Sequence, residues 1–148
     1  MFELNESDEG QRLRCHFGMD DKTKDVVVTR SLPLATMTKS EAIRLCIAKW
    51  EVIVLLCEEG FRIESEGGHN TCALCHMFLN KGNNTCNTLF GKKCPISVAT
   101  GRDTCHGTPY FSFARADKDD LDARMEEAVR EVTFLRGLLE LAVEEERG

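Results

Sequence analysis

No apolar run in the sequence approaches the roughly 20 residues that a helix needs to cross a bilayer. The first 12 residues are acidic and contain no apolar stretch of the kind found in a secretory signal. These two absences predict a cytoplasmic protein with no membrane contact. In such a reducing compartment, clustered cysteines indicate metal ligands or redox groups rather than disulfides.

The short motifs of common enzyme sites are also missing. The chain contains no phosphate-cradling glycine-rich loop, no G-x-S-x-G nucleophile turn and no H-E-x-x-H metalloprotease motif. A second C-x-x-C pair is absent as well. These absences favour a binding protein without catalytic activity.

Charge is distributed unevenly along the 148 residues. Residues 1–66 carry 9 basic and 13 acidic side chains, a net −4, and residues 117–148 carry 5 and 11, a net −6. Residues 67–116 carry 5 basic and 1 acidic side chain, a net +4. Bulk charge therefore does not draw the whole chain to nucleic acid, although the basic middle segment could bind it.

A chain of this length fits a single domain, residues 1–148, and its sequence divides into segments. Residues 1–37 read as an extended N-terminal segment that includes a β-hairpin. Residues 38–60 predict a helix that starts at a capping box formed by Thr38 and Glu41. Its apolar stripe runs through Ile43, Ile47, Trp50, Val54 and Cys57.

Residues 117–147 predict a longer, acidic C-terminal helix. Apolar side chains recur along it at steps of four and three, at Leu121, Met125, Ala128, Val132, Leu135, Leu139 and Ala142. This spacing is typical of a coiled-coil seam. The seam can pair with the first helix in a hairpin, or with a second copy of the chain in a homodimer. We therefore expect an α+β but mainly α fold, with two long helices, little sheet and a small metal-bound loop module.

The module covers residues 67–116, which contain 6 glycines and 2 prolines and no long apolar pattern, so a metal is expected to order them. Cys72 and Cys75 stand two residues apart, a spacing that lets both sulfurs reach one ion. Structural zinc sites take four such ligands. The set is completed by Cys94 and Cys105, with Cys86, His76 and His106 as alternates.

Two further interpretations concern the cysteines. Cys15, Cys46 and Cys57 are expected to be buried thiols that act as small apolar residues. A cysteine followed by proline, among loosely spaced cysteines, also suits an iron–sulfur cluster, and the protein would then be a redox protein or an enzyme. Zinc and an iron–sulfur cluster both stay open from the sequence.

A binding surface can also be drawn from residues that flank the predicted ligands: Lys92, Lys93, Arg102 and Tyr110. Basic side chains and an exposed tyrosine would bind phosphates and stack on bases. Against this, residues 110–113 alternate in polarity like a strand, so Phe111 and Phe113 would fill a small core beside the metal.

Several motifs together resemble a group of small cysteine-rich proteins predicted in bacteriophages and some microbes. They are Cys72-Ala-Leu-Cys75, Cys94-Pro95-Ile96, Thr100-Gly101 and Cys105-His106-Gly107-Thr108-Pro109-Tyr110. The resemblance covers residues 45–115 and implies a phage-encoded protein of the host cytoplasm, but no activity. In similar chains a cysteine stands close before Cys-Pro, whereas Cys86 is separated from Cys94 by seven residues, so Cys86 is kept as an alternate.

The sequence thus predicts a zinc-stabilised, non-enzymatic binding protein that acts on a protein of the host cell. The acidic C-terminal helix suits a basic partner. Nucleic-acid binding through the basic middle segment and an iron–sulfur redox function are the alternatives.

Overall fold

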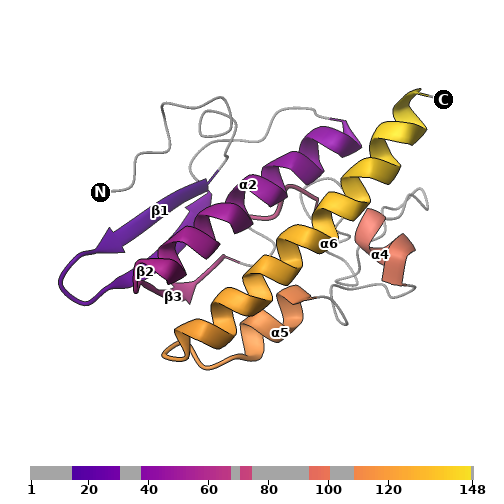
Figure 1. Ribbon diagram of the computed structural model, residues 1–148. Helices are drawn as coiled ribbons and strands as arrows, with labels where there is room; N and C mark the ends of the chain where they lie inside the picture. Colours follow the sequence, from indigo (N-terminus) through magenta and orange to yellow (C-terminus); the bar gives the residue numbers. More distant parts are fainter. Residues whose placement is uncertain (1–14, 31–37, 68–70, 75–93, 101–108, 148) are drawn as a thin grey trace, which may run out of the picture.

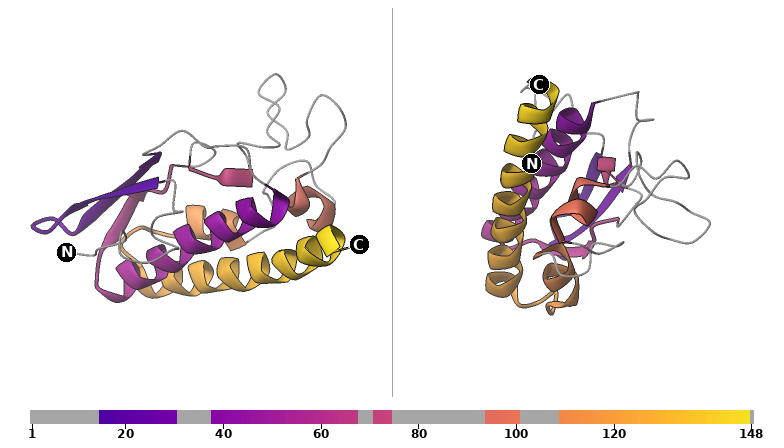
Figure 2. Two further views of the ribbon diagram at one scale, coloured as in Figure 1. Left: turned by 90° about the horizontal axis from the view of Figure 1, so that it is seen from above. Right: turned by 90° about the vertical axis from the view of Figure 1, so that its right-hand side faces the viewer.

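The computed structural model describes residues 15–30, 38–67, 71–74, 94–100 and 109–147. In these ranges, two long helices lie side by side and form one layer (Figure 1). A three-stranded sheet and two short helices lie on one side of that layer (Figure 2). The opposite side of the helix pair faces outward.

An antiparallel hairpin is formed by strand β1 (Cys15–Asp20) and strand β2 (Asp25–Arg30), where the sequence predicts one. Asp20 shapes the turn, because its carboxylate accepts hydrogen bonds from the backbone N–H groups of Lys22 (2.9 Å) and Thr23 (3.3 Å). These two hydrogen bonds lower the pKa of Asp20.

Strand β3 (Arg62–Ser65) joins β2 in parallel, so the strand order is β1-β2-β3. A parallel pair needs a crossover connection, and here a helix supplies it. One face of the sheet is apolar and buried, with side chains of Cys15, Phe17, Val26, Val28 and Ile63. This face and the long helices enclose the core.

The crossover helix is α2 (Lys39–Glu58). The predicted capping box is present: the backbone N–H of Glu41 donates to the Thr38 hydroxyl at 3.2 Å, and the N–H of Thr38 donates to the Glu41 carboxylate at 2.9 Å. Gly60 follows the helix with φ of +88°, a conformation that glycine adopts without strain.

Helix α6 (Leu121–Arg147) runs antiparallel to α2. Ion pairs join their facing ends and middles, from Lys39 to Glu145 at 3.0 Å and from Arg136 to Glu51 at 3.5 Å. The buried residues of the α6 seam are Ala128, Val132, Leu135 and Ala142, and Leu138 lies beside them. The seam considered for a homodimer therefore packs inside the chain.

Two short helices, α4 (Pro95–Thr100) and α5 (Pro109–Arg115), lie within the predicted metal module. Residues 110–113, expected to be strand-like, are helical. Pro109 suits the first position of a helix because its fixed φ is helical and it needs no N–H partner there. Tyr110 and Phe113 then lie one helical turn apart, and both rings contact Trp50. The four-residue pattern is too short to distinguish a strand from a helical turn.

The predicted fold class is wrong as a whole. We expected a mainly α fold with little sheet and a metal-bound cysteine-rich loop module. Instead, the core is completed by a three-stranded sheet, and part of the range expected to be loop is helical. Pairing of β3 with β2 joins residues more than 30 positions apart, and no local sequence pattern encodes it. No set of three or more metal-ligating side chains comes together within the described residues.

Candidate functional site

A buried ion pair lies between α2 and the end of β3. The Lys49 ammonium donates to the Glu66 carboxylate at 2.6 Å, and the two side chains are 3% and 12% exposed. Lys49 also donates to the Thr71 hydroxyl at 2.8 Å, and that hydroxyl donates to the Glu66 backbone carbonyl at 2.6 Å. Burial alone would lower the pKa of Lys49, but the charge and hydrogen bond of Glu66 outweigh it and raise the pKa.

Gly67 allows the chain to approach itself closely beside this pair. Its φ is +90°, a region that other residues rarely adopt. An added Cβ would overlap the Thr71 side chain and would lie 2.9 Å from the Val28 carbonyl oxygen. Glycine at this position therefore lets Thr71 reach both Lys49 and Glu66.

Tyr110 connects α5 to the same carboxylate. Its hydroxyl donates to the second Glu66 oxygen at 3.0 Å. Its ring meets the Trp50 ring edge-on at 5.9 Å between centroids, and the Phe113 ring meets Trp50 at 5.0 Å. Tyr110 is thus half-buried and engaged in the core, whereas the nucleic-acid alternative needs it as an exposed stacking group.

Glu131 of α6 is a buried carboxyl group in the same region, 2% exposed. Neither of its oxygens has a hydrogen-bond partner in the described part of the chain. Burial raises its pKa to about 7, and the nearby Cys72 thiol adds to the shift. The backbone N–H of Tyr110 is close enough to oppose the shift, but its geometry falls short of a hydrogen bond. Much of Glu131 is therefore protonated near neutral pH.

Two thiols meet beside these groups. The sulfur atoms of Cys46 in α2 and Cys72 are 4.0 Å apart. Cys46 is buried, and its contact with Cys72 together with burial raises its pKa well above the ordinary value. The charge of Lys49, which lies one turn further along α2, opposes that rise. The cluster formed by Cys46, Cys72, Lys49 and Glu66 is called the thiol corner below.

The other expected apolar cysteines behave as predicted in one respect: Cys15 and Cys57 are buried free thiols. Burial is the main cause that raises the pKa of each to about 11. Neither would carry a thiolate at neutral pH, so their role is packing.

Of the predicted metal ligands, the structure describes Cys72 and Cys94. Cys72 is half-buried in the thiol corner, and Cys94 is buried immediately before α4. The other predicted ligands and alternates lie outside the described residues: Cys75, Cys86, Cys105, His76 and His106. The same applies to the basic residues of the predicted binding surface, Lys92, Lys93 and Arg102.

Two residues of this region have a contact or a burial that was not predicted from the sequence. Cys46 is a buried thiol, as predicted, but its contact with Cys72 was not expected. Its spacing from Lys49 and Trp50 puts all three on one face of α2. Glu131 was not singled out from the sequence of the acidic C-terminal helix. Its position three residues after Ala128 and four before Leu135, both in the apolar seam, was the available signal of burial.

Comparison of the chain with protein-family models, curated proteins and solved structures finds no match. Among the helices of the described ranges, none combines the length and apolar character that crossing a membrane requires. The chemistry of the thiol corner is therefore the basis on which a function can be argued.

Proposed function

We propose that this protein is a zinc-stabilised binding protein without catalytic activity, encoded by a phage and directed at a protein of the host cell. The observation that carries the proposal is the position of two predicted ligands. Cys72 stands shortly before residues 75–93 and Cys94 immediately after them. Leu74 and Cys94, which flank residues 75–93, are 0% and 1% exposed. The described residues on both sides of this segment are therefore buried in the core, and each side includes a predicted cysteine ligand.

Thiolate sulfur is a soft ligand that suits Zn²⁺ and iron–sulfur clusters. When bound, zinc would cross-link the cysteine-rich segment to itself and to the core, and its binding free energy would contribute to folding. A zinc ion with four protein ligands has no open position for a substrate. Lys49, Glu66 and Thr71 bond to one another beside Cys72, an arrangement that suits a structural role.

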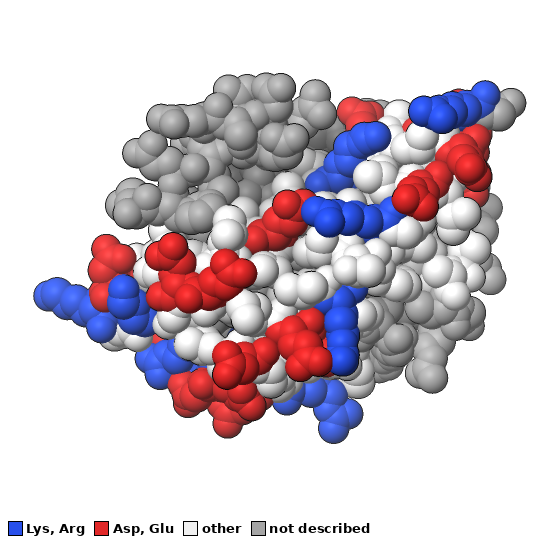
Figure 3. Space-filling model, viewed as in Figure 1, with Lys and Arg blue, Asp and Glu red and all other residues white. Residues whose placement is uncertain are grey.

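The outward face of the two long helices supports a protein as the partner. Figure 3 shows that acidic and basic side chains are interspersed with uncharged surface on this face. The exposed apolar side chains Leu55, Val129 and Leu141 come from α2 and α6. Protein interfaces combine apolar groups with a polar rim, whereas nucleic acid requires a basic surface that follows its phosphates.

The metal is tested by elemental analysis of protein purified without exposure to oxygen. One zinc ion per chain is expected, and Cys72→Ser and Cys94→Ser should each lose it. Cys57→Ala is the matched control, because Cys57 is also a buried cysteine but lies at the far end of α2. Iron with absorbance near ~400 nm would instead establish the cluster alternative. Protein that folds without any metal would overturn the proposal.

The partner is tested by retaining host proteins on the immobilised, zinc-loaded chain. We expect one host protein to be retained in a fixed ratio and to be lost with the Cys72→Ser variant. A complex with DNA or RNA that weakens steeply with salt would favour the nucleic-acid alternative. Failure of the folded, zinc-loaded chain to retain any protein would refute the proposed function.

A further inference from the structure

We propose that Cys46, in the middle of α2, is a ligand of the same metal ion as Cys72, an extension that rests on the proposed zinc site. The two sulfur atoms are 4.0 Å apart. In a tetrahedral zinc site with Zn–S bonds of about 2.3 Å, neighbouring sulfurs are ~3.8 Å apart. The two thiols therefore already stand close to the spacing that one ion would impose on them.

Both sulfurs are held by well-packed elements. Cys46 lies on α2 between Ile43 and Trp50, which are both buried. On the other side, Cys72 is preceded by Thr71, whose hydroxyl is fixed by Lys49 and Glu66, and is followed by the buried Ala73 and Leu74. Ligands that are positioned before the metal arrives lose less conformational freedom when they bind it.

A buried cation, which pairs with Glu66, lies close to the two thiols. Four thiolates around Zn²⁺ carry a net charge of about −2, which nearby cations offset. The Lys49 ammonium is such a cation, because it lies one helical turn after Cys46 and acts electrostatically on Cys46 and Cys72. Glu66 and Thr71 accept hydrogen bonds from the ammonium, and Tyr110 donates a hydrogen bond to Glu66.

Two other relations between the thiols are chemically reasonable. A disulfide would need the sulfurs at about 2.05 Å, roughly half their present separation. A weak S–H···S hydrogen bond is compatible with the observed distance, since thiols are weak donors and weak acceptors. The experiment must therefore separate a shared metal ion from a thiol contact alone.

A consequence follows for the rest of the ligand set. If Cys46 and Cys72 both bind an ion that takes four ligands, two positions remain. The proposed function gives one of them to Cys94, so Cys75 and Cys105, with the further alternates, compete for the other, and at least one of these two cysteines is not a ligand. The ion would also be bonded directly to α2, and its removal would loosen the core as well as the cysteine-rich segment.

Cobalt substitution counts the thiolates, since the intensity of thiolate-to-Co²⁺ charge transfer grows with their number. The full chain is titrated with Co²⁺ and then with Zn²⁺ against a chromophoric chelator. Cys46→Ala should lose about a quarter of the charge-transfer intensity of a four-thiolate site. Its zinc affinity should fall by at least about tenfold, because even loss of a ligand's hydrogen-bond partner costs that much. The control Cys57→Ala should keep both values.

Cadmium NMR gives a readout in the wild-type chain, in case Cys46→Ala does not fold. With ¹¹³Cd in the site, scalar coupling to the β-protons of Cys46 is expected, as well as to those of Cys72. The proposal would be overturned if Cys72 but not Cys46 showed coupling and the cobalt spectrum of Cys46→Ala were unchanged. The protein would then have a metal site, but Cys46 would only contact Cys72 and would not bind the ion. A wild-type chain that binds neither Co²⁺ nor Cd²⁺ would refute the metal site itself.

Discussion

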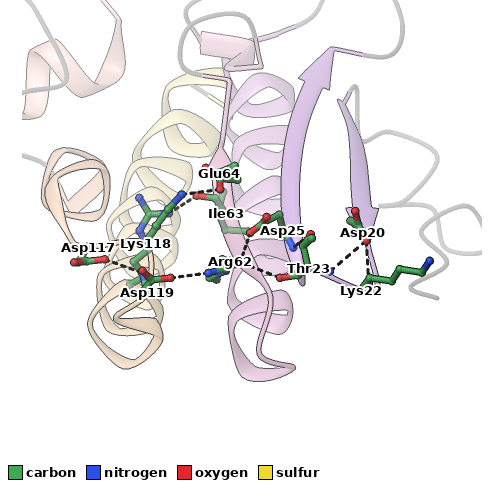
Figure 4. Close-up of polar contacts among 11 residues, drawn as sticks. Asp20, Lys22, Thr23, Asp25, Arg62, Ile63, Glu64, Asp117, Lys118 and Asp119 are labelled. Atoms are coloured by element: carbon green, nitrogen blue, oxygen red, sulfur yellow. Dashed lines mark hydrogen bonds and ion pairs between the residues drawn. The ribbon is translucent and has the colours of Figure 1, made fainter.

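Strand β3 has an ion-pair network at each end, and the two networks differ in burial. At its start, Arg62 lies 2.9 Å from Asp25 and 2.9 Å from Asp119, and these three side chains are 34%, 27% and 62% exposed (Figure 4). Just beyond its other end, Glu66 lies 2.6 Å from Lys49 inside the molecule. The bond lengths are similar, but the surroundings are not.

This difference decides what each network does. Water and salt screen the exposed charges, so pairs at the start of β3 are expected to contribute little. The buried charges have lost their hydration, and each depends on its partner to replace it. The buried network also holds Thr71, and with it Cys72, against α2. Substitutions in the buried network should therefore change the position of Cys72, and substitutions at the start of β3 should not.

The largest expected effect comes from Lys49→Met, which leaves the Glu66 carboxylate buried without its cation. We expect a loss of about 3–5 kcal/mol in the free energy of unfolding, measured by urea denaturation. The double variant Lys49→Met, Glu66→Gln should recover most of it, because neither member of the buried pair then carries a charge. A loss in Lys49→Met below about 1 kcal/mol would mean that the buried pair behaves like an exposed one.

Glu131 sharpens the comparison, because it is a buried carboxyl beside the same network without a cation of its own. Its pKa is raised from 4.5 to about 7, so the folded state binds its proton more tightly than the unfolded state. The stability that this adds is fully present below about pH 4.5 and is lost as the pH rises through 7. Between pH 4.5 and 8 the loss should amount to about 3 kcal/mol.

Glu131→Gln tests this, since it keeps the shape of the side chain and removes the titration. The free energy of unfolding of wild type and variant is measured across this pH range under identical buffer and metal conditions. The difference between them should change with pH, in favour of the variant at high pH. Parallel profiles would show that Glu131 does not titrate in this range.

Gly67→Ala is expected to have the next largest effect. Gly60 provides a matched control, because its φ is +88° against +90° at Gly67, yet an added Cβ at Gly60 would meet nothing within 4 Å. Gly60→Ala should therefore cost only the backbone strain, about 1 kcal/mol. Gly67→Ala adds the displacement of Thr71 and should cost about 2 kcal/mol or more.

If the proposed zinc site is present, zinc affinity separates these two variants further. Displacement of Thr71 moves the neighbouring Cys72, so Gly67→Ala should weaken metal binding, and Gly60→Ala should not. Equal unfolding free energies and equal zinc affinities in both variants would show that the close approach at Gly67 affects neither stability nor metal binding.

Local features of the fold could be predicted from the sequence. The capping box at Thr38 and Glu41, the hairpin and the apolar seam of α6 depend on residues within a few positions of one another. The parallel pairing of β3 with β2 is different, because α2 stands between them and the strand is four residues long. Residues 110–113 were read with the wrong period, since four alternating residues fit a helix turn as well as a strand.

The candidate site was predictable only in part. Cys72 and Cys94 could be singled out by motif, but contact between Cys46 and Cys72 arises when residues 71–74 are brought against α2. Lys49 and Glu66 carried no signal either, because a buried pair and two solvent-facing charges look alike in a sequence. Partners separated by 17 residues are joined only by the tertiary fold.

The smallest effect is expected at the pair formed by Lys118 with Glu64, the third residue of β3, where the two charged atoms are 2.7 Å apart and both side chains are partly open to solvent (Figure 4). Lys118→Ala should shift the midpoint of thermal unfolding by no more than about 2 °C. In about 1 M NaCl, where the Debye length is ~3 Å, the shift should disappear. The loss caused by Lys49→Met should persist in the same salt series, because bulk ions do not reach a buried pair. If both losses respond equally to salt, the exposed and the buried ion pairs of this region do not differ in the way their burial implies.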